Sequence, residues 1–171
     1  SVNGIDGFAV GPALECREFL RVYERHPRRS LKLEDDALEI AGKLLELWGV
    51  VEVGKGKDIA REKLENGEAY AKLKEIISNQ GGNPELKSDN LELGGITEDI
   101  FAYKDGKISL IDNKKIFTVC KSLGNPRVKE SGIYFYKVVG DSVTKGEKIA
   151  TIYATSESRM SLAKKVWEKE K

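Results

Sequence analysis

The sequence predicts an α+β fold with a helical first half and a second half built mainly from strands. Up to residue 84, apolar residues recur at helical spacing and the segments end at Gly or Pro. From residue 96, short alternating segments are separated by turn dipeptides such as Asp105-Gly106. We therefore expect a helical domain over residues 1–84, a linker over 85–95, and a β-rich domain with a closing helix over 96–171.

Composition and charge exclude several classes of protein. The chain has 171 residues, of which 40% are hydrophobic and 33% charged, enough for a packed core under a solvated surface. The 29 basic and 28 acidic side chains give a net charge of +1, which lacks the bulk positive charge of most nucleic-acid binders. No apolar run approaches the ~18 residues that span a bilayer, and the first residues do not resemble a signal peptide. We predict a cytoplasmic protein that binds neither nucleic acid nor membranes.

Four helices are expected in the first half. The first begins at Pro12, where the missing N–H costs nothing, and ends before Pro27. The apolar residues of the second fall on one face, and an Asn-Gly pair separates the third from the fourth. The second, third and fourth helices are expected over residues 34–47, 58–65 and 68–78.

The second half alternates strands with two helices. Asp105-Gly106 is a strong signal for a two-residue hairpin, so we expect the segments on either side of it to pair with each other. The expected strands are 96–104, 107–111, 132–139, 142–143 and 148–154, and the expected helices are 113–123 and 156–169.

Cysteine and histidine are too few for a conventional zinc site. Cys16 and Cys120 are far apart and form no CxxC pattern, and His26 is the only histidine. A Ser-His-Asp triad would have to use His26, which lies in a run of charged residues. We interpret His26 as a surface residue at a helix end, where positive charge suits the helix dipole.

Residues 137–154 place two tight turns, at Gly140-Asp141 and Lys145-Gly146, around a short strand. This pattern resembles the barrel-sandwich, or hammerhead, module of biotinyl and lipoyl carrier domains. Such carriers display a modifiable lysine at a hairpin tip, commonly flanked by methionines. Residues 103–107 contain lysines without that setting, and the only methionine is Met160. We therefore expect a scaffold without a covalent cofactor, and a carrier domain remains a minor alternative.

Residues 7–18 read Gly-Phe-Ala-Val-Gly-Pro-Ala-Leu-Glu-Cys-Arg-Glu. They resemble a stretch shared by the family of thymidine, pyrimidine-nucleoside and archaeal AMP phosphorylases. Gly-Pro-Ala-Leu-Glu and the Lys-Glu-Ser-Gly-Ile-Tyr of residues 129–134 look like the archaeal AMP phosphorylase branch. The likeness continues in the same order at residues 42–46, 67–77, 80–84, 111–116 and 152–159.

The resemblance implies that residues 1–84 end a catalytic α/β domain and that residues 96–171 form the C-terminal hammerhead domain. It implies a parent reaction in which AMP and the co-substrate phosphate give adenine and ribose 1,5-bisphosphate. Thymidine or another pyrimidine nucleoside is the alternative substrate.

In this family, the phosphate loop, the base-binding residues and the general acid precede the Gly-Pro-Ala-Leu-Glu stretch. We therefore expect a C-terminal fragment with a structural or assembly role and no catalytic or substrate-binding residues of its own. Its expected partners are the rest of the phosphorylase and further copies in a homo-oligomer. A free-standing interaction module is the hypothesis from a different class.

The resemblance also implies one ion site. Bacterial relatives bind a monovalent cation through backbone carbonyls and a glutamate near the first helix, and these positions correspond to Asp6, Ala9 and Glu18. We therefore predict a possible K⁺ site at these three residues. Helix-dipole electrostatics alone is the competing explanation for a carboxylate early in that helix.

Overall fold

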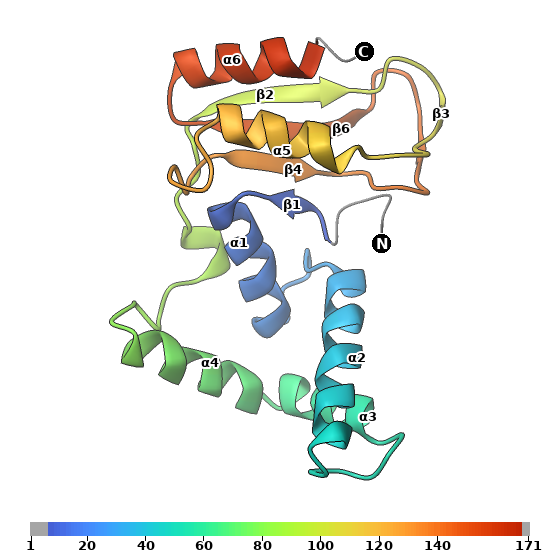
Figure 1. Ribbon diagram of the computed structural model, residues 1–171, viewed down its shortest axis with the longest axis vertical. Helices are drawn as coiled ribbons and strands as arrows, with labels where there is room; N and C mark the ends of the chain where they lie inside the picture. The colour runs from blue at the N-terminus through green and yellow to red at the C-terminus, as the bar shows by residue number, and fades with distance from the viewer. Residues whose placement is uncertain (1–6, 169–171) are drawn as a thin grey trace. The chain divides into compact units, whose positions relative to one another are not determined.

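Figure 1 shows the computed structural model of the chain, which describes residues 7–168. The chain forms two compact units. Unit 1 combines residues up to 18 with those from 91 onwards, and unit 2 comprises residues 19–90. The first crossing between the units lies inside helix α1 (Pro12–Tyr23). This division differs from the expected one, because the residues before 19 belong with the C-terminal half.

Unit 1 is built on a four-stranded antiparallel sheet in the order β1-β4-β6-β2. Strand β6 (Lys148–Ala154) is paired along both edges, with β4 (Gly132–Phe135) on one side and β2 (Ile96–Phe101) on the other. The edge strand β1 (Ala9–Val10) pairs with β4, so that Val10 lies opposite Ile133. The predicted α+β class is confirmed.

Helices α5 (Asn113–Ser122) and α6 (Glu157–Glu168) pack with the sheet to form the main core (Figure 1). Helix α5 begins where the Asp112 carboxylate accepts hydrogen bonds from the backbone N–H groups of Lys114 and Lys115, a normal N-cap. The largest fully buried apolar side chains of this core are Val119, Leu123, Ile133 and Ile152.

The predicted hairpin around Asp105-Gly106 is wrong. Strand β2 ends at Phe101, and β3 (Gly106–Lys107) pairs with β5 (Ser142–Val143) instead of with β2. The segment between β2 and β3 bonds elsewhere: the Asp105 carboxylate accepts from the backbone N–H of Lys145 at 2.6 Å, and Ala102 exchanges backbone hydrogen bonds with residues 146 and 147. These long-range bonds outweigh the local turn preference.

Unit 2 contains the end of α1, then α2 (Leu31–Leu47), α3 (Gly56–Glu65), α4 (Glu68–Asn79) and the 3₁₀ helix η1 (Ser88–Asn90). The four predicted helices are confirmed with small shifts in their ends. Helix α2 begins earlier than expected because the Ser30 side chain caps it by accepting from the backbone N–H of Leu33. The small core of this unit comprises Val22, Leu38, Ala60 and Leu64.

Helices α2 and α3 approach each other through two glycines. A Cβ built on Gly56 would lie 2.0 Å from the carbonyl oxygen of Gly42, so any side chain at either position would force the helices apart. Gly42 and Gly56 therefore serve helix packing.

The segment predicted as a linker, residues 85–95, is folded rather than loose. Ser88 is 1% exposed within η1, and the Gly94 backbone N–H donates to the Glu130 carbonyl oxygen in unit 1. Across residues 7–168, none of the helices has the length and apolarity needed to cross a lipid bilayer.

Two tight turns of unit 1 lie on either side of strand β5. Gly140 has φ +102° and Gly146 has φ +83°, a region that L-residues rarely adopt. A Cβ at either position would meet no atom within 4 Å, so a substitution there is opposed by backbone strain alone.

We expect Gly140→Val and Gly146→Val each to lower the free energy of unfolding by about 1–2 kcal/mol, because each forces a β-branched residue into a left-handed conformation. Urea denaturation followed by circular dichroism measures the change. Gly95→Val is the matched control, since Gly95 also has open space around its Cβ position but no positive φ. Unfolding midpoints that stay unchanged in both turn variants would contradict the assignment.

Candidate functional site

Strand β1 and the start of α1 contain two of the three residues predicted to bind a cation. Ala9 is buried in β1, and Glu18 is 4% exposed in α1. The Phe8 backbone N–H donates to Glu18 Oε2 at 2.8 Å, so the carboxylate lies beside the residue that precedes Ala9. The third predicted residue, Asp6, lies outside the described residues.

The same segment holds a second carboxylate in place. Glu15 Oε1 accepts from the Gly11 backbone N–H at 3.0 Å, at the first turn of α1. Glu18 and the backbone carbonyls of this segment are oxygen donors, the ligand type that alkali and other hard cations prefer. The residues present are therefore chemically suited to K⁺, and the site remains a prediction.

Aromatic side chains from β4 lie on the sheet face opposite the core. Because side chains alternate along a strand, Tyr134 and Tyr136 face away from Ile133 and Phe135. The Arg17 guanidinium lies over the Tyr134 ring, 5.1 Å from its centroid, and the two tyrosine rings meet edge to face at 5.2 Å.

A chain of polar contacts continues this face across β6 to β2. The Tyr136 hydroxyl lies 3.2 Å from Thr151 Oγ1, which donates to Asp99 Oδ1 at 2.6 Å. Lys148 Nζ pairs with Asp99 at 2.9 Å. Hydrogen bonds from Thr151 and Lys148 lower the pKa of Asp99. In the run Tyr-Phe-Tyr of residues 134–136, the two tyrosines fall on the same side of an extended chain. This pattern could have predicted the aromatic and polar face, which was not predicted.

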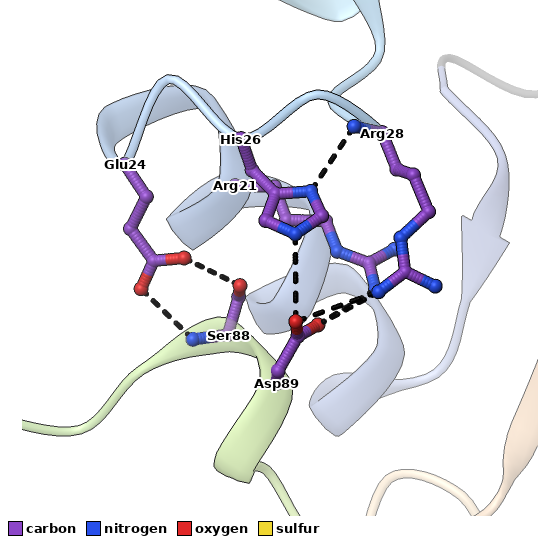
Figure 2. A network of polar contacts seen from close by, with 6 residues as sticks. All are labelled: Arg21, Glu24, His26, Arg28, Ser88 and Asp89. Carbon is purple, nitrogen blue, oxygen red and sulfur yellow. Dashed lines mark hydrogen bonds and ion pairs between the residues drawn. The ribbon is translucent and has the colours of Figure 1, made fainter.

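Unit 2 contains a separate ion-pair network centred on Asp89 (Figure 2). The buried Arg21 donates to Asp89 Oδ1 at 3.1 Å, Arg28 approaches the same oxygen at 3.3 Å, and His26 Nε2 lies 3.4 Å from Oδ2. The hydrogen bond from Arg21, with the positive charges of Arg21, Arg28 and His26, lowers the pKa of Asp89.

A second set of contacts, between Glu24 and Ser88, joins the same two segments of unit 2. Glu24 accepts from both the backbone N–H of Ser88, at 2.9 Å, and its hydroxyl, at 2.5 Å (Figure 2). Charged hydrogen bonds thus join residues 21–28 to η1. They fix the turn that follows α1.

The predicted surface position of His26 is only partly correct. Its side chain is 20% exposed, its Nδ1 accepts from the Arg28 backbone N–H at 3.0 Å, and its Nε2 faces Asp89. Both ring nitrogens are therefore engaged, while the neighbouring Ser88 hydroxyl bonds to Glu24. These contacts orient a turn. In a nucleophile–base pair the histidine would instead bond to the hydroxyl of the nucleophile.

The part of the chain that the structure describes contains no group of three or more His, Cys, Asp or Glu side chains that could hold a metal ion. Cys120 is buried in the core of unit 1, where burial and the nearby charge of Glu15 raise its pKa to about 12, and Cys16 lies in α1.

Comparison with known proteins identifies the class to which this fold belongs. Residues 107–170 match the family model described as the pyrimidine nucleoside phosphorylase C-terminal domain. The match covers α5, α6 and the strands between them in unit 1. The chain belongs to the pyrimidine nucleoside phosphorylase family.

Several relatives of this chain are archaeal AMP phosphorylases. That of Pyrococcus furiosus is 43% identical over 157 residues, and that of Methanosarcina acetivorans is 41% identical over 157 residues; each match covers 92% of this chain and 31% of the relative. The Methanocaldococcus jannaschii protein is 40% identical over 160 residues, with shares of 94% and 32%. The chain therefore spans about a third of the length of the relatives it matches.

The lowered pKa of Asp89 makes the stability of unit 2 depend on pH. A carboxylate whose pKa lies below its ordinary value of 3.8 stabilises the fold above that value and loses this contribution as pH falls through its folded-state pKa. We expect Asp89→Asn to destabilise the chain at pH 6 and to differ progressively less from the unsubstituted chain as pH falls to about 3.

Urea unfolding at several pH values measures this difference. Asp36→Asn is the control, since Asp36 forms only an exposed pair with Lys32 one helical turn away. A difference between Asp89→Asn and the unsubstituted chain that is the same at every pH would refute the assignment.

Proposed function

We propose that this chain is the C-terminal part of a phosphorylase that converts AMP and phosphate into adenine and ribose 1,5-bisphosphate. The observation that carries the proposal is the alignment of 92% of the chain with AMP phosphorylases at 41–43% identity. The match to a pyrimidine nucleoside phosphorylase domain keeps a pyrimidine nucleoside as the second candidate substrate.

Within that enzyme, the role proposed for the described residues is structural. Phosphorolysis needs cationic and N–H donors around phosphate and a proton donor for the departing base. Arg21, His26 and Arg28 are instead directed at Asp89, and Arg25 and Arg29 at the buried Glu34. We place the phosphate-binding and proton-donating groups in the other two thirds or so of the enzyme.

An exposed apolar surface on unit 2 supports a role in assembly. Contiguous exposed apolar side chains usually mark a surface that another protein segment covers. Three exposed apolar side chains share one face of α2 at i, i+4 and i+7 spacing, and three more follow in residues 48–53. The members are Ile40, Leu44, Leu47, Trp48, Val50 and Val53. Its proposed partners are the rest of the phosphorylase and, in a homo-oligomer, further copies.

Unit 1 is proposed to be the hammerhead module and to carry no covalent cofactor. Its short strands β3 and β5 and the two glycine turns agree with that architecture. The proposed ion is K⁺, at Asp6, Ala9 and Glu18, as the resemblance to bacterial relatives implies. The proposed location is the cytoplasm, with no nucleic-acid or membrane partner.

We expect the 171-residue chain to release no adenine from AMP above the buffer blank, in phosphate buffer containing potassium. Positioning of reactants supplies roughly 7–11 kcal/mol of such a barrier, and a chain without the phosphate and base sites cannot provide it. The intact enzyme should turn over AMP and prefer it to thymidine. Turnover by the chain alone would place the catalytic groups among these residues, and an intact protein inactive on both substrates would favour a free-standing interaction module.

The intact mass of the chain should be unchanged after co-expression with biotin and lipoate ligases. Lys104 precedes β3 and Lys107 lies within it, and neither has the surrounding residues that carrier ligases recognise. A biotin carrier domain labelled in the same cells is the positive control. A stoichiometric adduct on either lysine would instead support the carrier hypothesis.

A further inference from the structure

Strand β3 of unit 1 (Figure 1) lies beside a cavity of about 580 Å³ to which the proposed function assigns no role. This volume is within the range of small-molecule sites. The lining residues that the structure describes all belong to unit 1. The cavity is therefore a property of that unit alone.

The inner wall of the cavity is apolar. Ile111, Ile116 and Phe135 line it and belong to the main core of unit 1, each less than 9% exposed. Ala102, which is 7% exposed, lines it as well. An apolar ligand in the cavity would therefore cover the edge of the hydrophobic core and displace water from it.

Two further aromatic side chains line the cavity besides Phe135. Trp167, from the last turn of α6, is partly buried against the core, and Tyr103 is 78% exposed. Aromatic rings attract one another in offset and edge-to-face arrangements that a saturated chain cannot form. The three side chains therefore favour a ligand that contains an aromatic ring.

The two aspartates of the lining accept hydrogen bonds from backbone groups. Asp112 caps α5, and the Asp105 carboxylate accepts from the Lys145 backbone N–H. Both carboxylates therefore have donors within the chain, and a cationic ligand would have to compete with them.

The lysines of the lining are also engaged or in water. Lys137 pairs with Glu147 at 2.8 Å. Lys104 and Lys115 lie over aromatic rings of the same lining, 5.4 Å and 5.5 Å from the ring centroids, and Lys107 is exposed. A ligand of either charge would lose hydration against the apolar wall, a cost that an uncharged ligand does not meet.

We propose that this cavity binds an uncharged aromatic molecule, with its ring against the apolar inner wall and Trp167. A polar group of the ligand would point towards the exposed rim, which includes Tyr103 and Leu110, 78% and 59% exposed. The site requires only the fold of unit 1 and does not depend on the proposed phosphorolysis.

Benzamide, benzoate and benzamidine test the ligand class, because they share one shape and are neutral, anionic and cationic. The chain has two tryptophans, whose indole N–H groups give separate peaks in a ¹H–¹⁵N correlation spectrum, and Trp48→Phe assigns them. We expect benzamide to shift the Trp167 peak saturably and to leave in place the peak of Trp48, which is 71% exposed in unit 2. Benzoate and benzamidine should bind about tenfold more weakly.

Two matched pairs of variants test the rim at exposed positions, where folding is not at risk. Tyr103→Ala should weaken benzamide binding about threefold or more, whereas Phe117→Ala removes a ring that is 67% exposed outside the lining and should leave binding unchanged. Leu110→Gln should weaken binding to a similar extent, and Leu162→Gln, at a 53% exposed leucine outside the lining, should have no effect. The dispersion of the same spectra verifies that each variant is folded.

A saturable shift of the Trp167 peak with benzamide, together with weaker binding of both charged analogues, supports the proposal. No saturable shift, binding of benzoate or benzamidine as tight as that of benzamide, or equal effects within either matched pair would overturn it. Because the readout is binding to this chain, an inactive phosphorolysis assay leaves the result intact.

Discussion

The fold of unit 1 depends on the pairing of two residues near the start of the chain with a strand far along it. Ala9 and Val10 form the edge of the sheet beside β4, with Val10 opposite Ile133. The approach is so close that a Cβ on Gly132 would lie 2.3 Å from the Val10 carbonyl oxygen. This contact anchors the start of α1 to the sheet and brings the Glu18 carboxylate to Phe8. The local arrangement of Ala9 and Glu18, where a cation site is predicted, thus depends on this strand pair.

Most elements could be predicted from local pattern, and the errors arose where long-range bonds decide. Strand β6 spans seven residues between turn signals, and its bounds were predicted without error. Strand β1 has two residues, too few for any alternation to appear, so it was missed. Asp105 was predicted to turn a hairpin, yet its carboxylate bonds to a backbone N–H forty residues away, a partner that no local pattern indicates.

The candidate sites also divide into those indicated by local sequence and those formed by long-range contacts. Short motifs in the right order predicted the family, because they follow the linear sequence. The cation site that the resemblance implies at Asp6, Ala9 and Glu18 stays a prediction. The Asp89 network joins side chains up to 68 residues apart. The residue types were visible in the sequence, but their convergence is a product of the tertiary fold. The numbers of acidic and basic residues alone could not have shown where such side chains meet.

The discontinuity of unit 1 has a consequence for the order in which the chain folds on the ribosome. Synthesis delivers the N-terminus first, and domains generally fold as units. Residues 19–90 are continuous, so their helices and the Asp89 network can form as soon as that stretch has emerged. The residues of β1, made earlier, have no strand to join until residues 132–135 are made. Strand β1 is thus paired only after residues 132–135 have been made, and it stays unpaired while the helices of unit 2 assemble.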